Sequence, residues 1–212
     1  MGAYPVPAVS TIRVVATPRG PARLHLSGRG AGLLVLGHGA GGGPDAPDLL
    51  AATAGALEAG LRVVRVEQPW RVTGRRIAEA PPHLDAAWLA VVRTLRPRGP
   101  LFLGGRSAGA RVACRTAEEL GAAGVLALAF PLVPPGRNAS RLDELMAPSV
   151  PRLVVQGSRD AFGVPSAMPG LRVEVVEGAD HAFAVRRRDG RTPDEVLSQV
   201  RDVVRDWLQT VT

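Results

Sequence analysis

Residues Leu101 to Ala110 read LFLGGRSAGA, an apolar strand that runs through the pattern G-x-S-x-G into a helix-forming segment. The glycines two residues before and after Ser107 leave room for a sharp turn from strand to helix. Such a turn lifts the serine hydroxyl out of the sheet, where a base can reach it. This stretch therefore predicts a nucleophile elbow with Ser107 at its tip.

The base that would serve Ser107 can be found by elimination. The chain contains four histidines: His25, His38, His83 and His181. In enzymes built on this elbow the order along the chain is serine, then the acid, then histidine. Only His181 follows Ser107, and it lies in a polar turn directly after the apolar segment 171–176. We therefore expect His181 to be the base.

The orienting acid is expected at the end of a strand between Ser107 and His181. Asp160 fits best, because it closes the segment 152–160, in which an apolar strand leads into a glycine-containing turn. From there its carboxylate can accept the Nδ1 proton of the histidine. Asp180 is the weaker candidate, since adjacent residues rarely aim their side chains at each other. The alternatives are a turn residue at Asp160 that bonds its own backbone and a packed or surface histidine at His181.

A second glycine-rich turn, GHGAGGG at 37–43, follows the apolar strand 33–36. It resembles the HGGG-type loops that help to form oxyanion holes. We expect the backbone N–H groups of Ala40 and of Ala108, the residue after the nucleophile, to face the developing negative charge. His38 is expected to brace this loop by hydrogen bonding. No metal is expected, because no histidine pair has ligand spacing.

The same loop allows a different interpretation, since Gly37 to Gly42 matches G-x-G-x-x-G and Glu67 follows at about the distance of a ribose-binding acid. Nucleotide binding is therefore an alternative. In a dinucleotide site, however, the glycines lead directly into a helix. Here the segment 44–48 intervenes, with Asp45 as the expected N-cap of a helix that begins late. We therefore expect no cofactor.

Length and composition limit the remaining possibilities. The 212 residues suffice for one well-buried domain, 1–212, but hardly for two. All 26 basic residues are arginines and the net charge is +7, yet they form no long basic run with interleaved aromatics, so nucleic acid is not an expected partner. The single cysteine, Cys114, excludes an internal disulfide and favours a reducing compartment.

Membrane attachment and export are not expected either. No stretch approaches the length of a membrane span. Residues 1–7 have neither the basic region nor the continuous apolar core of a signal peptide. We therefore expect a soluble, cytoplasmic protein that does not bind membranes. The sequence leaves its oligomeric state open.

Hydrophobic patterns place the secondary structure. Apolar segments predict about eight strands, at 11–16, 23–26, 33–36, 61–66, 101–103, 125–130, 153–155 and 171–176. Helical patterns cover 48–59, 83–95, 108–120, 141–146 and 193–211, the last with Thr192 as its N-cap. Strands without helices at the start, followed by alternating strands and helices, predict an α/β fold. We expect a mostly parallel sheet with an antiparallel start and helices on both faces.

The elbow, the glycine loop, Asp160 and His181 together resemble the α/β-hydrolase superfamily, near its small dienelactone-hydrolase-like members, over nearly the whole chain. Dienelactone hydrolases proper use a cysteine nucleophile, whereas this chain has Ser107. Ser107, Asp160 and His181 match the superfamily's catalytic positions. Its cap domain usually enters after the sixth strand, but only about twenty residues separate Phe130 from Arg152. The resemblance therefore implies an α/β-hydrolase fold without a cap and with an open site.

A narrower resemblance is carried by FPLVPPG at 130–136 and QGSRDAFG at 156–163. These stretches look like a group that contains a testis-expressed mammalian protein and a subunit of a histone acetyltransferase complex. Some members of that group serve as interaction scaffolds. A non-catalytic interaction module on the same fold is therefore the second hypothesis for this chain.

The first hypothesis is a serine hydrolase for the carboxylic ester or thioester of a small acyl substrate, acting through an acyl-enzyme. The candidates for substrate binding are His38, Trp70, Arg71, Arg75 and Arg106. The loop 68–76 could favour acidic acyl groups through its arginines, the third of which is Arg76. The alternative is a solvated basic loop with a packed Trp70.

Overall fold

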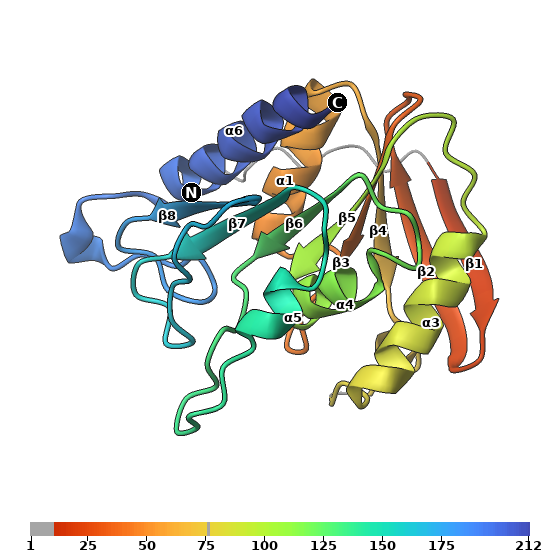
Figure 1. Ribbon diagram of the computed structural model, residues 1–212, viewed down its shortest axis with the longest axis horizontal. Helices are drawn as coiled ribbons and strands as arrows, with labels where there is room; N and C mark the ends of the chain where they lie inside the picture. Colours follow the sequence, from red (N-terminus) through yellow and green to blue (C-terminus); the bar gives the residue numbers. More distant parts are fainter. Residues whose placement is uncertain (1–10, 76) are drawn as a thin grey trace.

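The computed structural model describes residues 11–75 and 77–212, which form one eight-stranded sheet in the order β1-β2-β4-β3-β5-β6-β7-β8. The strands are β1 (Thr11–Thr17), β2 (Gly20–Ser27), β3 (Leu33–Gly37), β4 (Arg62–Glu67), β5 (Leu101–Arg106), β6 (Gly124–Leu128), β7 (Arg152–Gly157) and β8 (Leu171–Val176). Strand β2 pairs antiparallel with β1 and β4, and the other neighbours are parallel. The predicted sheet with its antiparallel start is therefore confirmed (Figure 1).

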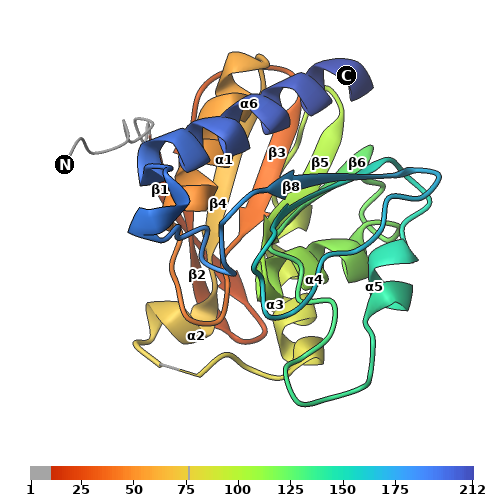
Figure 2. The ribbon, with the colours of Figure 1, turned by 90° about the vertical axis from the view of Figure 1, so that its left-hand side faces the viewer.

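Helices cover both faces of this sheet. They are α1 (Pro47–Glu58), α2 (Pro69–Val72), α3 (Pro81–Arg93), α4 (Ala108–Thr116), α5 (Leu142–Met146) and α6 (Pro193–Val211), with a 3₁₀ turn η1 (Arg187–Asp189). Helices α1 and α6 lie together on one face, and α3, α4 and α5 lie on the other (Figures 1 and 2). The connection from β6 to β7 holds only α5, so the described chain has no cap over the carboxyl edge of the sheet.

Each face of the sheet has its own apolar core. On the α3 side, Trp88 is fully buried among residues of β3, β5 and α4. On the α1 and α6 side, Trp207 packs edge-on against Phe102, with ring centroids 6.0 Å apart.

Helix α6 begins with the predicted capping box, in which Glu195 N–H donates to the Thr192 side chain and the Glu195 carboxylate accepts from Thr192 N–H.

Two local predictions are wrong. Helix α1 has Ala46 as its N-cap with no capping side chain, because Pro47 takes the first helical position and leaves Asp45 one residue before the cap. Asp45 lies 3.4 Å from the buried guanidinium of Arg65. The expected loop 68–76 contains a helical turn, α2, since Pro69 at its first position favours helical φ. Position 76 lies outside the described residues, as does the stretch 1–7.

Arginines link the helices on the α3 side. Arg115 of α4 donates to Asp85 of α3 at 2.6 Å and also pairs with Glu144 of α5. Arg111 donates to the same Glu144 at 2.9 Å. These part-buried ion pairs therefore link α3, α4 and α5 to one another through side chains.

Within the described residues, no helix is long and apolar enough to cross a bilayer.

The elbow packs directly on the backbone of β3. A Cβ atom on Gly109 would lie 2.2 Å from the carbonyl oxygen of Gly37, and one on Gly105 would lie 2.4 Å from the same atom. Both distances are far below van der Waals contact. Only glycine at these two positions lets α4 start as close to the sheet as it does.

We expect Gly109→Ala to lower the free energy of unfolding by about 1–3 kcal/mol or more, the usual cost of forcing extra atoms into a packed core. Urea unfolding followed by circular dichroism would measure the change. Gly41→Ala is the matched control, because a Cβ atom there meets no atom within 4 Å. Equal stability of the two variants would contradict this account of the elbow.

Candidate active site

Ser107 lies between the end of β5 and the first residue of α4, at the carboxyl edge of the parallel strands. Its φ of +50° and ψ of −108° belong to a strained conformation that few non-glycine residues adopt. Its N–H donates to the carbonyl of Leu128 at 2.9 Å, which ties the turn to the end of β6. The predicted nucleophile therefore occupies a sharp strand-to-helix turn whose strain the surrounding sheet maintains.

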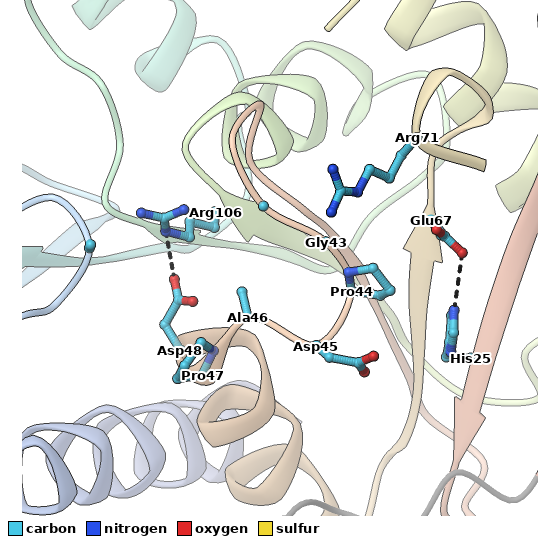
Figure 3. A pocket seen from close by; sticks show the side chains of 12 residues that line it. His25, Gly43, Pro44, Asp45, Ala46, Pro47, Asp48, Glu67, Arg71 and Arg106 are labelled. Atoms are coloured by element: carbon cyan, nitrogen blue, oxygen red, sulfur yellow. Dashed lines mark ion pairs between the residues drawn. The ribbon is translucent and has the colours of Figure 1, made fainter. Parts of the chain in front are cut away.

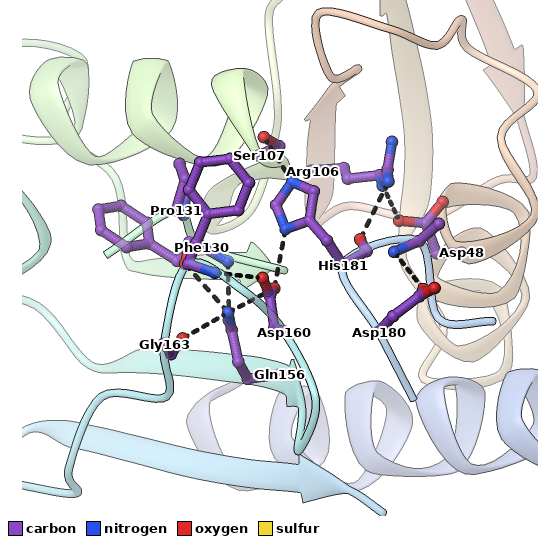
Figure 4. A network of polar contacts seen from close by, with 12 residues as sticks. Asp48, Arg106, Ser107, Phe130, Pro131, Gln156, Asp160, Gly163, Asp180 and His181 are labelled. Carbon is purple, nitrogen blue, oxygen red and sulfur yellow. Dashed lines mark hydrogen bonds and ion pairs between the residues drawn. The ribbon is translucent and has the colours of Figure 1, made fainter. Parts of the chain in front are cut away.

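His181 bridges Ser107 and Asp160 (Figure 4). Its Nδ1 lies 2.8 Å from Asp160 Oδ2, and its Nε2 lies 3.1 Å from Ser107 Oγ. Because a carboxylate only accepts, the Nδ1–H donates to Asp160 and Nε2 is left to accept the serine hydroxyl proton. Phe162 packs against the imidazole, with ring centroids 4.5 Å apart. This arrangement can take a proton from Ser107 and return it.

The Asp160 carboxylate is held by a network that starts at Gln156, a residue that the sequence analysis overlooked. The Asp160 side chain is fully buried. Its Oδ2 accepts from Gln156 Nε2 at 2.7 Å, and its Oδ1 accepts from Phe162 N–H at 2.9 Å. Gln156 also exchanges hydrogen bonds with the Phe130 backbone. A glutamine at the end of an otherwise apolar strand is the signal that could have identified it.

Asp180, the weaker candidate for the acid, has a local role instead. Its Oδ1 accepts from the backbone N–H groups of Ala182 and Ala184, at 2.8 and 3.0 Å. These bonds fold the turn that carries His181. Asp180 thus shapes the backbone around the base, while Asp160 contacts the imidazole.

The glycine loop after β3 runs beside the nucleophile. A Cβ atom on Gly39 would lie 3.5 Å from Ser107 Cβ, so Ala40, the next residue, follows directly beside the serine. Ala108 is the first residue of α4, and its N–H therefore has no acceptor within the helix. The two predicted amide donors thus come from segments that flank Ser107.

His38 is buried behind this loop. Its Nε2 accepts from Gln68 N–H at 3.1 Å, which leaves Nδ1 as the donor to the Gly39 carbonyl at 2.9 Å. Its ring meets Trp70 edge-on, with centroids 5.4 Å apart. Burial lowers the pKa of His38, although the hydrogen bond to Gly39 opposes the shift. His38 therefore stays neutral and ties the glycine loop to the end of β4.

A cavity of about 550 Å³ lies next to the glycine loop (Figure 3). Of the five predicted substrate-binding residues, Arg71 and Arg106 line it. His38 and Trp70 are buried, at 3% exposure each. Arg75 lies outside it, 3.4 Å from Glu79.

The two arginines of the cavity differ in their partners. Arg106 Nε lies 3.1 Å from the buried Asp48 Oδ2, and Arg106 Nη2 donates to the His181 carbonyl at 3.0 Å. Burial raises the pKa of the Asp48 carboxyl, and the charge of Arg106 opposes the shift. Arg71 is exposed and, within the described part of the chain, its guanidinium forms no ion pair. Arg71 is therefore free to meet a ligand, whereas Arg106 is already occupied.

The residues expected for other chemistries are engaged elsewhere. Glu67, the acid of the nucleotide alternative, lies 3.6 Å from both His25 and Arg23. Cys114 is buried in α4, and burial raises the pKa of its thiol to about 12, so it does not supply a thiolate. Between residues 11 and 75 and between 77 and 212, no three His, Cys, Asp or Glu side chains gather as metal ligands.

The neutral, buried His38 should make stability depend on pH. Its pKa is lower in the folded chain than its usual value of about 6.5, so below that pH the unfolded chain binds the extra proton. The wild type should lose up to about 1.4 kcal/mol of unfolding free energy per pH unit relative to His38→Gln as the pH falls from 6.5. Urea unfolding between pH 5 and 8 would measure this difference. Parallel profiles for the two proteins would refute it, since the other three histidines are present in both.

Solved structures of hydrolases share this fold. A serine hydrolase homologue from Coxiella burnetii superposes with a TM-score of 0.72 at 18% identity, over 97% of this chain and 100% of the other. A serine hydrolase without lid from Xanthomonas campestris gives 0.71 at 20% identity, over 98% of each chain. A dienelactone hydrolase from Anabaena variabilis gives 0.69 at 16% identity, over 95% and 97%. At these identities the likeness shows the fold.

Sequence comparison gives the family. No curated protein sequence matches the chain. The narrower resemblance, to the group with the testis-expressed protein, is not among these similarities and stays a prediction. A family model, described as alpha/beta hydrolase domain, matches residues 30–209. The match covers most of the chain and includes the elbow, Asp160 and His181. The chain therefore belongs to the α/β-hydrolase domain family, as one of its small members without a cap.

Proposed function

We propose that this α/β hydrolase is a serine hydrolase that cleaves carboxylic esters or thioesters of small acyl groups. The observation that carries the proposal is the position of His181, within hydrogen-bond distance of both Ser107 Oγ and Asp160 Oδ2 at the open carboxyl edge of the sheet. A buried carboxylate, an imidazole and a serine on a strained turn together form the arrangement that activates a hydroxyl nucleophile.

The reaction proceeds in two halves. Ser107 Oγ attacks the ester carbonyl carbon while His181 Nε2 takes the hydroxyl proton, and Asp160 stabilises the imidazolium that forms. The tetrahedral intermediate then collapses, and His181 gives its proton to the departing alcohol or thiol. Water next attacks the acyl-enzyme and gives one proton to His181. The second collapse returns that proton to Ser107 and releases the acid.

The negative charge of each intermediate falls between the glycine loop and α4. We assign the backbone N–H groups of Ala40 and Ala108 as its donors, because Gly39 lies close to Ser107 and Ala108 begins the helix. The N-terminus of α4 adds the positive end of its helix dipole. Each such donor contributes about 10²–10³ in rate in enzymes of this type.

Access to this site favours small, soluble substrates. Only α5 interrupts the connection from β6 to β7, so the site is open. The neighbouring cavity of about 550 Å³ holds one side of such a substrate, where the exposed guanidinium of Arg71 favours a negatively charged group. The single cysteine remains the reason to expect a cytoplasmic location.

Replacement of the nucleophile or the base tests the proposal. We expect Ser107→Ala and His181→Ala each to lower the hydrolysis of short p-nitrophenyl esters by at least about 10³-fold, because the residues of such a triad act as a unit. Labelling of the protein by a fluorophosphonate at neutral pH should disappear in both variants. His83→Ala is the matched control for a histidine outside the site and should keep both activities.

A folded wild type that neither hydrolyses these esters nor reacts with the fluorophosphonate would overturn the proposal. The interaction module would then be the better hypothesis. Stabilisation of the protein by NAD in a thermal melt would instead favour nucleotide binding at the Gly37 loop.

Two arginines from the same basic loop test the substrate preference. Arg71 lines the cavity, whereas Arg75 pairs with Glu79 outside it. Arg71→Ala should lower kcat/KM for p-nitrophenyl hemisuccinate, relative to the neutral butyrate ester, by up to about fivefold, because an exposed ion pair contributes at most about 1 kcal/mol. Arg75→Ala removes the same charge and should leave the ratio unchanged. An unchanged ratio in Arg71→Ala would refute the role of Arg71.

A further inference from the structure

The loop that carries His181 is hydrogen-bonded to the sheet through the backbone of its first half. This base loop, residues 177–186, runs from β8 towards η1 and contains Phe183 at a φ of +57°. Its first half is fastened to the end of β7, since Arg159 N–H donates to the Ala179 carbonyl at 2.9 Å. From Asp180 to Ala184, the backbone hydrogen bonds in the described structure, such as Phe183 N–H to Asp180 O, stay within the turn.

Arg106, the last residue of β5, contacts this second half of the base loop. It precedes Ser107, and its Nη2 donates to the carbonyl oxygen of His181 itself at 3.0 Å (Figure 4). Its Nε faces the buried Asp48 at the start of α1 at 3.1 Å. Its Nη1 would lie 3.3 Å from a Cβ atom on Gly39. One guanidinium thus bonds to the base loop, pairs with α1 and lies beside the glycine loop.

Arg159 offers an informative comparison. It precedes Asp160 as Arg106 precedes Ser107, and it also donates to a carbonyl of the base loop, that of Gly178, at 2.7 Å. Its counter-ion is Asp189, at 3.2 Å. The bond of Arg159 therefore falls on the half of the loop that the backbone already fastens, whereas the bond of Arg106 falls on the residue that carries the imidazole.

We propose that Arg106 is a positioning residue for His181, which it holds by its main-chain carbonyl while its guanidinium forms an ion pair with the buried Asp48. The inference rests on the proposed function and concerns how accurately the His181 imidazole is positioned. This role differs from the substrate binding that the sequence analysis expected of Arg106. The Arg106 side chain is only 15% exposed, and its guanidinium already has a carboxylate partner. Its Nε is paired with Asp48 and its Nη2 donates to the His181 carbonyl, so these two nitrogens are engaged within the protein.

The expected effect is on the rate of reaction and not on substrate affinity. A displacement of about 1 Å at a reacting group can cost about 100-fold in rate. We therefore expect Arg106→Ala to lower kcat for a neutral p-nitrophenyl ester by up to about 100-fold with little change in KM. Because Arg106 lines the cavity, guanidinium ion at non-denaturing concentration should restore part of kcat. Sodium chloride at equal ionic strength should not.

Matched variants separate positioning from general destabilisation. Arg111→Ala removes an arginine of similar exposure that pairs with Glu144 away from the base loop, and it should keep kcat without responding to guanidinium. Arg159→Ala should lose less kcat than Arg106→Ala. If Arg106→Ala does not fold, Arg106→Lys keeps a cation for Asp48 but lacks the second donor for the His181 carbonyl. A lower kcat in that folded variant supports the proposal.

A readout that needs no turnover keeps the test independent of the proposed function. The Nδ1 proton of His181, hydrogen-bonded to Asp160, should give a protected downfield NMR signal in the wild type and exchange faster in Arg106→Lys. The proposal is overturned if this signal and kcat match those of the wild type, or if guanidinium has no effect on Arg106→Ala. Absence of esterase activity in the wild type would instead defeat the proposed function and leave the NMR signal to decide the role of Arg106.

Discussion

The structure depends on one close approach, that of the nucleophile elbow to the backbone of β3. Gly105 and Gly109 both face the carbonyl oxygen of Gly37 across distances that no side chain could fill. This contact places Ser107 at the edge of the sheet with a φ of +50°. It also sets the glycine loop beside the serine, since the loop starts from Gly37. The nucleophile and its neighbouring amides are therefore consequences of a single packing constraint.

The residues that meet at this edge come from distant parts of the chain, and their arrangement follows from the parallel sheet. Ser107 follows β5, Asp160 follows β7 and His181 follows β8, and these strands are parallel, so all three residues lie at the same edge of the sheet. Polar bonds then refine the positions. Gln156 holds Asp160, Asp180 folds the turn of His181, and Arg106 spans the site. Hydrogen bonds thus fix the positions of the site residues, although the described part of the chain forms no lid over them.

Sequence patterns predicted the sheet, and they predicted that Ser107, Asp160 and His181 lie together, because these elements have local signatures. The G-x-S-x-G turn is contiguous, and the order of serine, acid and histidine leaves His181 as the one base that follows. The partners of Arg106 have no such signature. Asp48 is 58 residues from Arg106 in the chain, and only the packed fold shows that both are buried together. The same holds for Asp45, which pairs with Arg65 of β4 and lies one residue before the N-cap of α1.

Because every basic side chain is an arginine, the ion pairs that link the helices stay charged over an unusually wide range of pH. The bonds from Arg111 and Arg115 to Asp85 and Glu144 join α3, α4 and α5. A guanidinium does not lose its proton under any condition in which a protein stays folded, whereas an ammonium group does so in alkaline solution. These cross-links therefore persist into strongly basic media, where a lysine-built counterpart would fall apart. These ion pairs are instead lost in acid, where the carboxylates of Asp85 and Glu144 become protonated.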